Sequence, residues 1–327
     1  MRFRKHAKRL TLWTFISLFV LLVLALFSSS FLISSDKPRS EIIAKYAGPQ
    51  SIFVTLPDGT TVHLRDQGNP DGPVLVLLHG FAASLHSWEP WVAVLADEYR
   101  LISIDLPGHG ITGSTPAADY SRQSMSDFLH SVVNWRNLDR FILVGHSMGG
   151  GVALNYTLDH PQKIAGLVLI GASGLQEDSG DTSPGLFSLE NHPTLARLMR
   201  YITPRDSIRQ TMIDSYGLES HITEPLVDRY HDLLLHGDNR AAMIKRLLQR
   251  PTDAPMDRRL PEINVPVLLL WGSADRLVEL KYAKRMRSLM TTSELIIYQG
   301  LGHMPMEVIP DATARDMDRF IKAEITR

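Results

Sequence analysis

The stretch LVGHSMGGGVAL, residues 143–154, places one serine between regularly spaced glycines at the end of an apolar run. This order of residues is typical of a strand, a sharp turn and a helix. Gly145 and Gly149 lack Cβ atoms, so the end of the strand and the start of the helix can approach closely. The pattern predicts that Ser147 occupies the turn, with its hydroxyl above the end of a sheet.

The apolar run before the serine is one of six, and together they predict the fold class. Each run is short and rich in Val, Ile and Leu, as in strands buried on both faces of a parallel sheet. Segments with helical spacing lie between them, so we expect an α/β protein with a mostly parallel twisted sheet covered by helices. The other five runs are VLVLLHGF (74–81), RLISIDLPGHG (100–110), IAGLVLIGASG (164–174), PVLLLWGSAD (266–275) and ELIIYQGLGH (294–303).

Two segments depart from this alternation. Residues 51–65 have Asp58 and Gly59 at their centre and predict a leading antiparallel hairpin. Residues 176–257 have helical patterning and predict a helical cap, inserted into a core formed by residues 51–175 and 258–327. The alternative is that the insertion is a longer helical layer of the same core.

The N-terminal region predicts a membrane anchor. Residues 1–35 contain five basic residues and no acidic one, and residues 11–33 are uncharged and long enough to span a bilayer. The basic residues should remain cytoplasmic, so we expect a single-pass protein with its catalytic domain on the extracytoplasmic side. Residues 36–50 have the composition of a stalk. A cleaved signal peptide and secretion are the alternative.

Composition excludes several classes of protein. The chain has no cysteine, which excludes disulfides, thiolate metal sites and a cysteine nucleophile. Outside residues 1–35 there are 29 basic and 35 acidic residues, a formal charge of −6, which gives no reason to expect nucleic-acid binding. No motif implies a metal or an organic cofactor.

The carboxyl ends of the predicted strands carry the candidate catalytic residues, because ligands of open α/β sheets bind there. A serine nucleophile needs a base, and the base needs an orienting partner. His303 follows the last apolar run in a tight Gly- and Pro-bounded loop, and Asp275 ends the preceding run. Asp105 is the alternative acidic partner for the histidine, but we expect it to fix the turn that follows it. The backbone N–H of Met148, at the start of a helix, is a candidate oxyanion donor.

Other histidines lie in the same strand-end motifs. We expect His79 and His146, which adjoin glycines, to make local hydrogen bonds. His109 lies in a loop expected to form part of a pocket wall. Five further histidines lie on helical or loop segments without a partner signal, namely His160, His192, His221, His231 and His236.

From about Ser51 to Ile325 the chain resembles the α/β-hydrolase superfamily in five motifs that occur in the expected order. The resemblance implies that Ser147 is the nucleophile, His303 the base and Asp275 its orienting acid. It also implies an oxyanion hole formed by the backbone N–H groups of Phe81 and Met148. The motifs are HGF (79–81), DLPGHG (105–110), GHSMGG (145–150), WGSADRLV (271–278) and GHMPMEVIP (302–310).

Departures from particular subfamilies narrow the expected activity. Epoxide hydrolases and haloalkane dehalogenases use an aspartate where this chain has Ser147. Carbon–carbon bond hydrolases usually have an aromatic residue after the histidine, where this chain has Met304, and proline iminopeptidases have tryptophan at the place of Met148. We therefore expect a lipase-like carboxylesterase that cleaves a small-molecule or lipid ester through an acyl-enzyme. Carbon–carbon bond hydrolysis, acyl transfer and a catalytically silent binding module are the alternatives.

Overall fold

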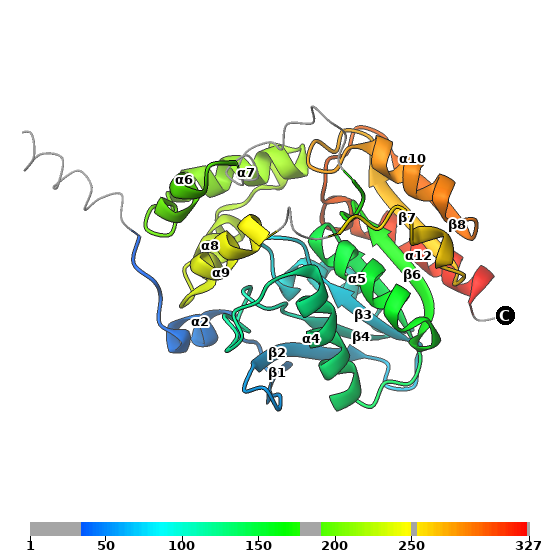
Figure 1. The fold of residues 1–327 in the computed structure, drawn as a ribbon, viewed down its shortest axis with the longest axis horizontal. Coiled ribbons are helices and arrows are strands. Elements are labelled where there is room, and N and C mark those ends of the chain that lie inside the picture. Colours follow the sequence, from blue (N-terminus) through cyan, green and yellow to red (C-terminus); the bar gives the residue numbers. More distant parts are fainter. Residues whose placement is uncertain (1–33, 177–190, 250–253, 326–327) are drawn as a thin grey trace, which may run out of the picture.

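The computed structural model describes residues 34–176, 191–249 and 254–325, which are built around one eight-stranded sheet (Figure 1). The strand order is β1-β2-β4-β3-β5-β6-β7-β8. Strand β2 pairs antiparallel with β1 and β4, and every other pair is parallel. The strands are β1 (Ser51–Thr55), β2 (Thr61–Gly68), β3 (Val74–Leu78), β4 (Arg100–Ile104), β5 (Phe141–His146), β6 (Ile164–Ile170), β7 (Val267–Gly272) and β8 (Ser293–Tyr298).

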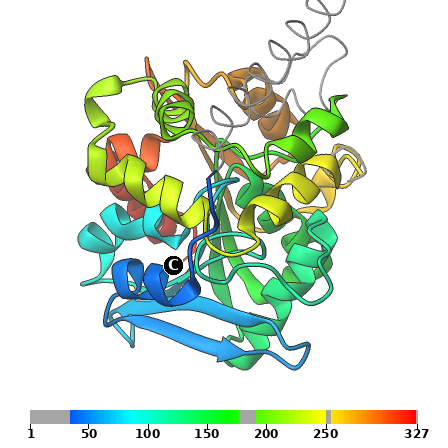
Figure 2. The same ribbon diagram turned by 90° about the vertical axis from the view of Figure 1, so that its left-hand side faces the viewer.

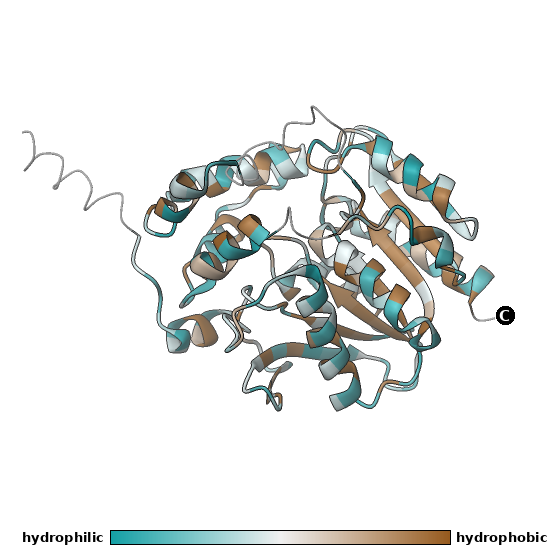
Figure 3. Cartoon of the chain, in the orientation of Figure 1, coloured by the Kyte–Doolittle hydropathy of each residue, from teal (hydrophilic) through white to brown (hydrophobic). Residues whose placement is uncertain are grey.

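The apolar runs form the central strands because both faces of the sheet are covered. Successive side chains of a strand point to opposite faces, so Val76 and Leu78 of β3 belong to one hydrophobic cluster and Leu75 and Leu77 to the other. All six residues of β5 are buried. Figure 3 shows the resulting band of hydrophobic strands beneath helices of mixed character. The predicted α/β class and the hairpin over residues 51–65 are confirmed.

Each helix of the core covers the sheet with its apolar side. In α4, Ser121 caps the N-terminus by accepting a hydrogen bond from the backbone N–H of Ser124. Helices α4, α5 and α10 contribute to one hydrophobic cluster, and α3 and α12 to the other. The bounds are α3 (Glu89–Leu95), α4 (Arg122–Trp135), α5 (Met148–Asp159), α10 (Leu280–Leu289), α11 (Pro305–Val308) and α12 (Pro310–Glu324), with 3₁₀ turns η1 (Leu85–Trp88), η2 (Pro161–Lys163) and η6 (Leu260–Glu262).

The regular elements that the structure describes between β6 and β7 are all helical, and loops and turns join them. Thr223 caps α8 by accepting a hydrogen bond from Leu226 N–H, and Gly217 ends α7 in the left-handed conformation. The exact limits of the cap, 176–257, stay a prediction, since 177–190 and 250–253 lie outside the described residues. The helices are α6 (Pro193–Leu198), α7 (Arg205–Tyr216), η4 (Glu219–His221), α8 (Glu224–Leu234) and α9 (Asn239–Gln249).

The predicted stalk over residues 36–50 is wrong. Residues Arg39–Tyr46 form helix α2, which lies between the β1–β2 hairpin and the cap (Figure 2). Ile42 is 1% exposed and packs with Ile111 and Leu233, and the Lys45 ammonium lies 2.6 Å from the Asp232 carboxylate. The composition is polar because only one side of this short helix faces the protein.

The predicted membrane anchor, residues 11–33, lies outside the described residues. Within residues 34–176, 191–249 and 254–325, no helix has the length and hydrophobicity needed to span a bilayer. The anchor stays a prediction from the sequence.

Candidate active site

Ser147 lies on a strained turn between β5 and α5. Its φ is 51° and its ψ −116°, a conformation that is unfavourable for a residue with a side chain. The surrounding backbone holds it there, because Ser147 N–H donates to the Ile170 carbonyl at 2.9 Å and Ser173 N–H donates to the Ser147 carbonyl at 3.0 Å. Backbone strain held in this way is common at functional sites.

The glycines on either side of Ser147 are required by close backbone contacts. A Cβ atom on Gly145 would lie 2.5 Å from the Gly149 carbonyl oxygen. A Cβ atom on Gly149 would lie 2.5 Å from the carbonyl oxygens of both Leu78 and His79. The spacing of glycines in the sequence therefore reflects the tight passage from β5 into α5 against the end of β3.

His303 and Asp275 form a buried hydrogen-bonded pair at the ends of β8 and β7. The distance from His303 Nδ1 to Asp275 Oδ2 is 2.7 Å. The other carboxylate oxygen of Asp275 accepts hydrogen bonds from the backbone N–H groups of Leu277 and Val278, both at 2.9 Å. With Nδ1–H donating to the carboxylate, the second ring nitrogen, Nε2, is left with its lone pair for accepting a proton.

Ser147 and the His303–Asp275 pair meet at the carboxyl end of β6. The Ile170 carbonyl holds Ser147 N–H, and a Cβ atom on the next residue, Gly171, would lie 2.9 Å from His303 Nδ1. His146 directly precedes Ser147, and the centre of its ring lies 4.6 Å from the centre of the His303 ring. The structure therefore brings the three predicted catalytic residues to one edge of the sheet.

The two predicted oxyanion donors belong to segments that adjoin Ser147. Met148 is the first residue of α5, where a backbone N–H has no acceptor within the helix. Phe81 follows Gly80, on which a Cβ atom would lie 3.1 Å from the Ser147 Cβ. The chain leaving β3 thus passes directly beside the serine, as an oxyanion hole requires.

His79, His109 and His146 are buried. His79 and His109 each donate to a nearby carbonyl, but the local hydrogen bond expected for His146 is wrong, because His146 Nε2 donates to the His303 carbonyl at 3.0 Å, 157 positions away. His79 Nδ1 donates to the Gly80 carbonyl at 2.8 Å, and its Nε2 accepts from Leu106 N–H at 3.0 Å. His109 Nδ1 donates to the Pro107 carbonyl, and the centre of the His109 ring lies 5.6 Å from the centre of the Phe81 ring. Burial lowers the pKa of all three, that of His109 to about 3. They therefore hold loops near the site in the neutral form.

Asp105 fixes a loop, as the sequence predicted, and is not the partner of His303. Its carboxylate accepts hydrogen bonds from Leu85 N–H and Ile111 N–H, both at 2.7 Å, and from His63 Nδ1 at 2.6 Å. Burial raises the pKa of Asp105, but the charge and hydrogen bond of His63 outweigh it, so the net shift is downward. The carboxylate stays ionised and joins two backbone segments to the His63 side chain.

The cap contacts the loop that carries His303, which the sequence did not predict. His303 N–H donates to the Ser215 carbonyl of α7 at 2.7 Å, and the Tyr216 hydroxyl donates to Glu307 Oε2 at 2.6 Å. Burial raises the pKa of both Tyr216 and Glu307. No sequence signal marks these contacts, because they join residues about ninety positions apart.

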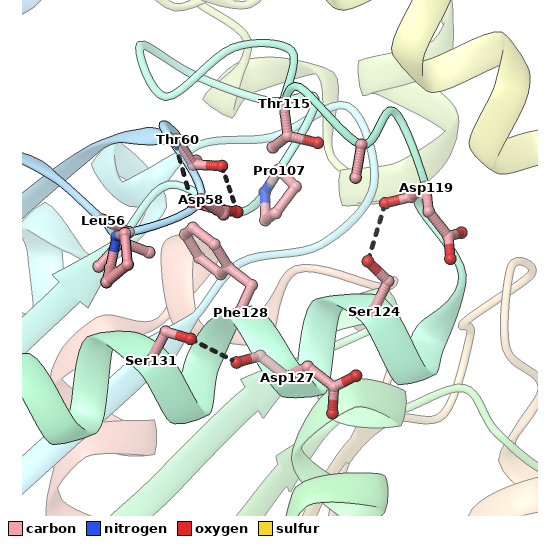
Figure 4. A pocket seen from close by; sticks show the side chains of 12 residues that line it. Leu56, Asp58, Thr60, Pro107, Thr115, Asp119, Ser124, Asp127, Phe128 and Ser131 are labelled. Atoms are coloured by element: carbon pink, nitrogen blue, oxygen red, sulfur yellow. Dashed lines mark hydrogen bonds between the residues drawn. The ribbon is translucent and has the colours of Figure 1, made fainter.

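A cavity of about 250 Å³ lies apart from these residues, between the β1–β2 turn, the loop after β4 and α4 (Figure 4). Its carboxylates are engaged within the protein, since Asp58 accepts from Thr60 and Asp119 accepts from Ser121 N–H. None of the predicted catalytic residues lines it. Its walls are formed by Leu56, Pro57, Asp58, Thr60, Pro107, Thr115, Ala117, Asp119, Ser124, Asp127, Phe128 and Ser131.

The fold and the strand-end residues define a hydrolase of the α/β class, and comparison with known proteins agrees. The chain belongs to the alpha/beta hydrolase fold family, whose model matches residues 73–309. It is 26% identical over 265 residues to the uncharacterised hydrolase YugF of Bacillus subtilis (strain 168), covering 81% of this chain and 96% of that protein. It is 27% identical to the 2-hydroxy-6-oxononadienedioate/2-hydroxy-6-oxononatrienedioate hydrolase of Cupriavidus pinatubonensis (strain JMP 134 / LMG 1197), covering 77% of this chain and 89% of that enzyme.

Solved structures share the fold. The crystal structure of a membrane phospholipase A, described as a bacterial virulence factor, aligns with a TM-score of 0.74 at 23% identity. The alignment covers 94% of this chain and 97% of the phospholipase. At this identity the match establishes the architecture alone.

Proposed function

We propose that the protein hydrolyses carboxylic esters through Ser147, His303 and Asp275. The observation that carries the proposal is the position of Ser147, on a strained turn beside the hydrogen-bonded His303–Asp275 pair. A serine hydroxyl in this position can attack a carbonyl carbon if a base removes its proton. His303 Nε2 is the atom left to do so, because Nδ1 is held by Asp275.

The proposed reaction proceeds through an acyl-enzyme. Ser147 Oγ bonds to the ester carbonyl carbon while His303 takes the hydroxyl proton. The negative charge that develops on the carbonyl oxygen is stabilised by the N–H groups of Phe81 and Met148. His303 then protonates the departing alcohol, and a water molecule, deprotonated by His303, releases the acid. Asp275 orients the imidazole and stabilises its cation.

We further propose a small-molecule or lipid ester as substrate, with the protein anchored in a membrane by residues 11–33 and its catalytic domain on the extracytoplasmic side. The uncharged run supports the anchor, and the shared fold of a membrane phospholipase A is compatible with a lipid substrate. Resistance of the full-length protein to extraction from membranes by alkaline carbonate tests the anchor.

Carbon–carbon bond hydrolysis is the second candidate, because the Cupriavidus relative is named as a hydrolase of 2-hydroxy-6-oxononadienedioate, which is not an ester. The decisive experiment compares p-nitrophenyl esters of increasing chain length with a 2-hydroxy-6-oxo-dienoate, using the full chain. We expect ester cleavage, labelling of Ser147 by a fluorophosphonate, and a loss of at least ~10³-fold in kcat for Ser147→Ala. Faster cleavage of the dienoate would favour the second candidate, and ester turnover by a folded Ser147→Ala protein would rule out Ser147 as the nucleophile.

A further inference from the structure

We propose that an exposed face of the cap rests on the lipid bilayer. The face consists of Leu195, Leu198 and Tyr201, which we call the α6 patch. These side chains are 49%, 54% and 54% exposed, the three highest values among the exposed large hydrophobic residues of the described chain. Isolated exposed hydrophobic residues are common, whereas a cluster of them in one short segment indicates an interaction surface.

The α6 patch consists of the outer side of α6, whose inner side is packed, and of Tyr201 in the turn that follows the helix. Ala196 is completely buried, and α6 contacts α9. Leu195 and Leu198 are three positions apart, so they lie on the same side of α6, and Tyr201 follows a further three positions on. The patch is thus presented outward by a helix that is fixed to the rest of the cap.

The position of Ser34 indicates that a lipid bilayer is the partner of the α6 patch. Ser34 N–H donates to the Tyr201 carbonyl at 3.0 Å, and the Ser34 hydroxyl donates to the Thr203 carbonyl at 3.2 Å. On the other side, the Arg240 guanidinium donates to the Ser34 carbonyl at 2.7 Å. Ser34, the first residue that the structure describes, therefore lies directly beside Tyr201, and the uncharged run of residues 11–33 precedes it in the sequence. Figure 1 shows the start of the coloured chain next to α6.

This attachment leaves little distance between the patch and a bilayer. Consecutive Cα atoms are about 3.8 Å apart, so a membrane span that ends at Ile33 keeps Tyr201 at the level of the lipid headgroups. Tyrosine is enriched at that level, and leucine can insert beyond it.

The charges next to the patch suit anionic headgroups. Arg197 and Arg200 are both exposed, and the Arg200 guanidinium lies 5.8 Å from the centre of the Tyr201 ring. Arg200 also pairs with Asp238 at 3.2 Å, so Arg197 supplies the net positive charge of the segment. Long basic side chains reach headgroups while their stems cover apolar surface.

The proposal rests on the proposed anchor, and one experiment separates the two. The chain contains no cysteine, so Leu198→Cys introduces a single labelling site for an environment-sensitive fluorophore. Trp135→Cys is the matched control, because Trp135 is an exposed hydrophobic residue at the end of α4. The labelled full-length proteins are reconstituted in vesicles of phosphatidylcholine and phosphatidylglycerol, and quenching by nitroxide lipids is compared with quenching by aqueous iodide.

We expect the label at position 198 to be quenched by nitroxide lipids and protected from iodide, with the reverse for position 135. If carbonate removes the protein from the vesicles, the anchor is wrong and the docking proposal falls with it. If the protein resists carbonate but position 198 is quenched by iodide as strongly as position 135, the anchor stands and the docking is wrong. Protection of position 198 from both quenchers would indicate a protein partner, such as a second copy, and would also overturn the proposal.

Discussion

Replacing Gly171 by alanine tests whether the position of His303 controls the reaction. Gly171 has φ +50°, and a Cβ atom there would lie 2.9 Å from His303 Nδ1 and 3.2 Å from Asp275 Oδ2. To reach the 3.4 Å of an ordinary contact, the imidazole must move by about half an ångström. A misplacement of about 1 Å in an active site can lower the rate by about 10²-fold.

We therefore expect kcat of Gly171→Ala on a soluble p-nitrophenyl ester to fall by about tenfold, or about 1.4 kcal/mol in the activation barrier. The left-handed conformation also disfavours alanine by about 1–2 kcal/mol, so the variant should unfold at a lower temperature. Activity and thermal unfolding are measured on the same preparation.

Gly237→Ala is the matched control. Gly237 has φ +47°, and a Cβ atom there would meet nothing within 4 Å. It should lose a similar amount of stability and keep its kcat. Equal kcat values for the two variants would refute the reasoning, because the loss would then not depend on contact with His303.

Three other perturbations have defined outcomes. Asp275→Asn should lower kcat by about 10⁴-fold, because an amide no longer fixes the imidazole in the correct tautomer; a loss below tenfold in ester hydrolysis would contradict the pairing. Stability should fall as pH is lowered from about 6.5, since the unfolded chain protonates His79, His109 and His146 while their lowered pKa values keep them neutral in the folded state. Each histidine lowers the free energy of unfolding by up to about 1.4 kcal/mol per pH unit. His109→Gln should therefore reduce the change of unfolding temperature with pH. An unchanged pH dependence would exclude protonation of His109 as a cause. Deleting residues 1–33 should preserve soluble-ester activity, whereas deleting 1–47 should also lower the unfolding temperature by exposing Ile111 and Leu233; equal unfolding temperatures would show that α2 adds no stability.

The sequence by itself determined the α/β fold and the positions of the candidate catalytic residues. Strands buried on both faces must be apolar along their whole length, so the runs ending at Ser147, Asp275 and His303 were recognisable one by one. Parallel strands place their carboxyl ends at one edge of the sheet, which predicted that these residues would meet. The glycines around Ser147 were informative because the turn leaves no space for a Cβ atom.

Only the tertiary structure decided how the N-terminal segment and the cap are attached. The sequence of α2 predicted a stalk, because it does not show that Ile42 is buried. The residues that bury Ile42 are Ile111 and Leu233, which are distant in the chain. The hydrogen bond from His303 N–H to the Ser215 carbonyl left no trace in the sequence either, since every residue carries the same backbone groups. Local patterns record the environment common to a whole strand or turn, whereas contacts between distant segments depend on the particular surfaces that folding brings together.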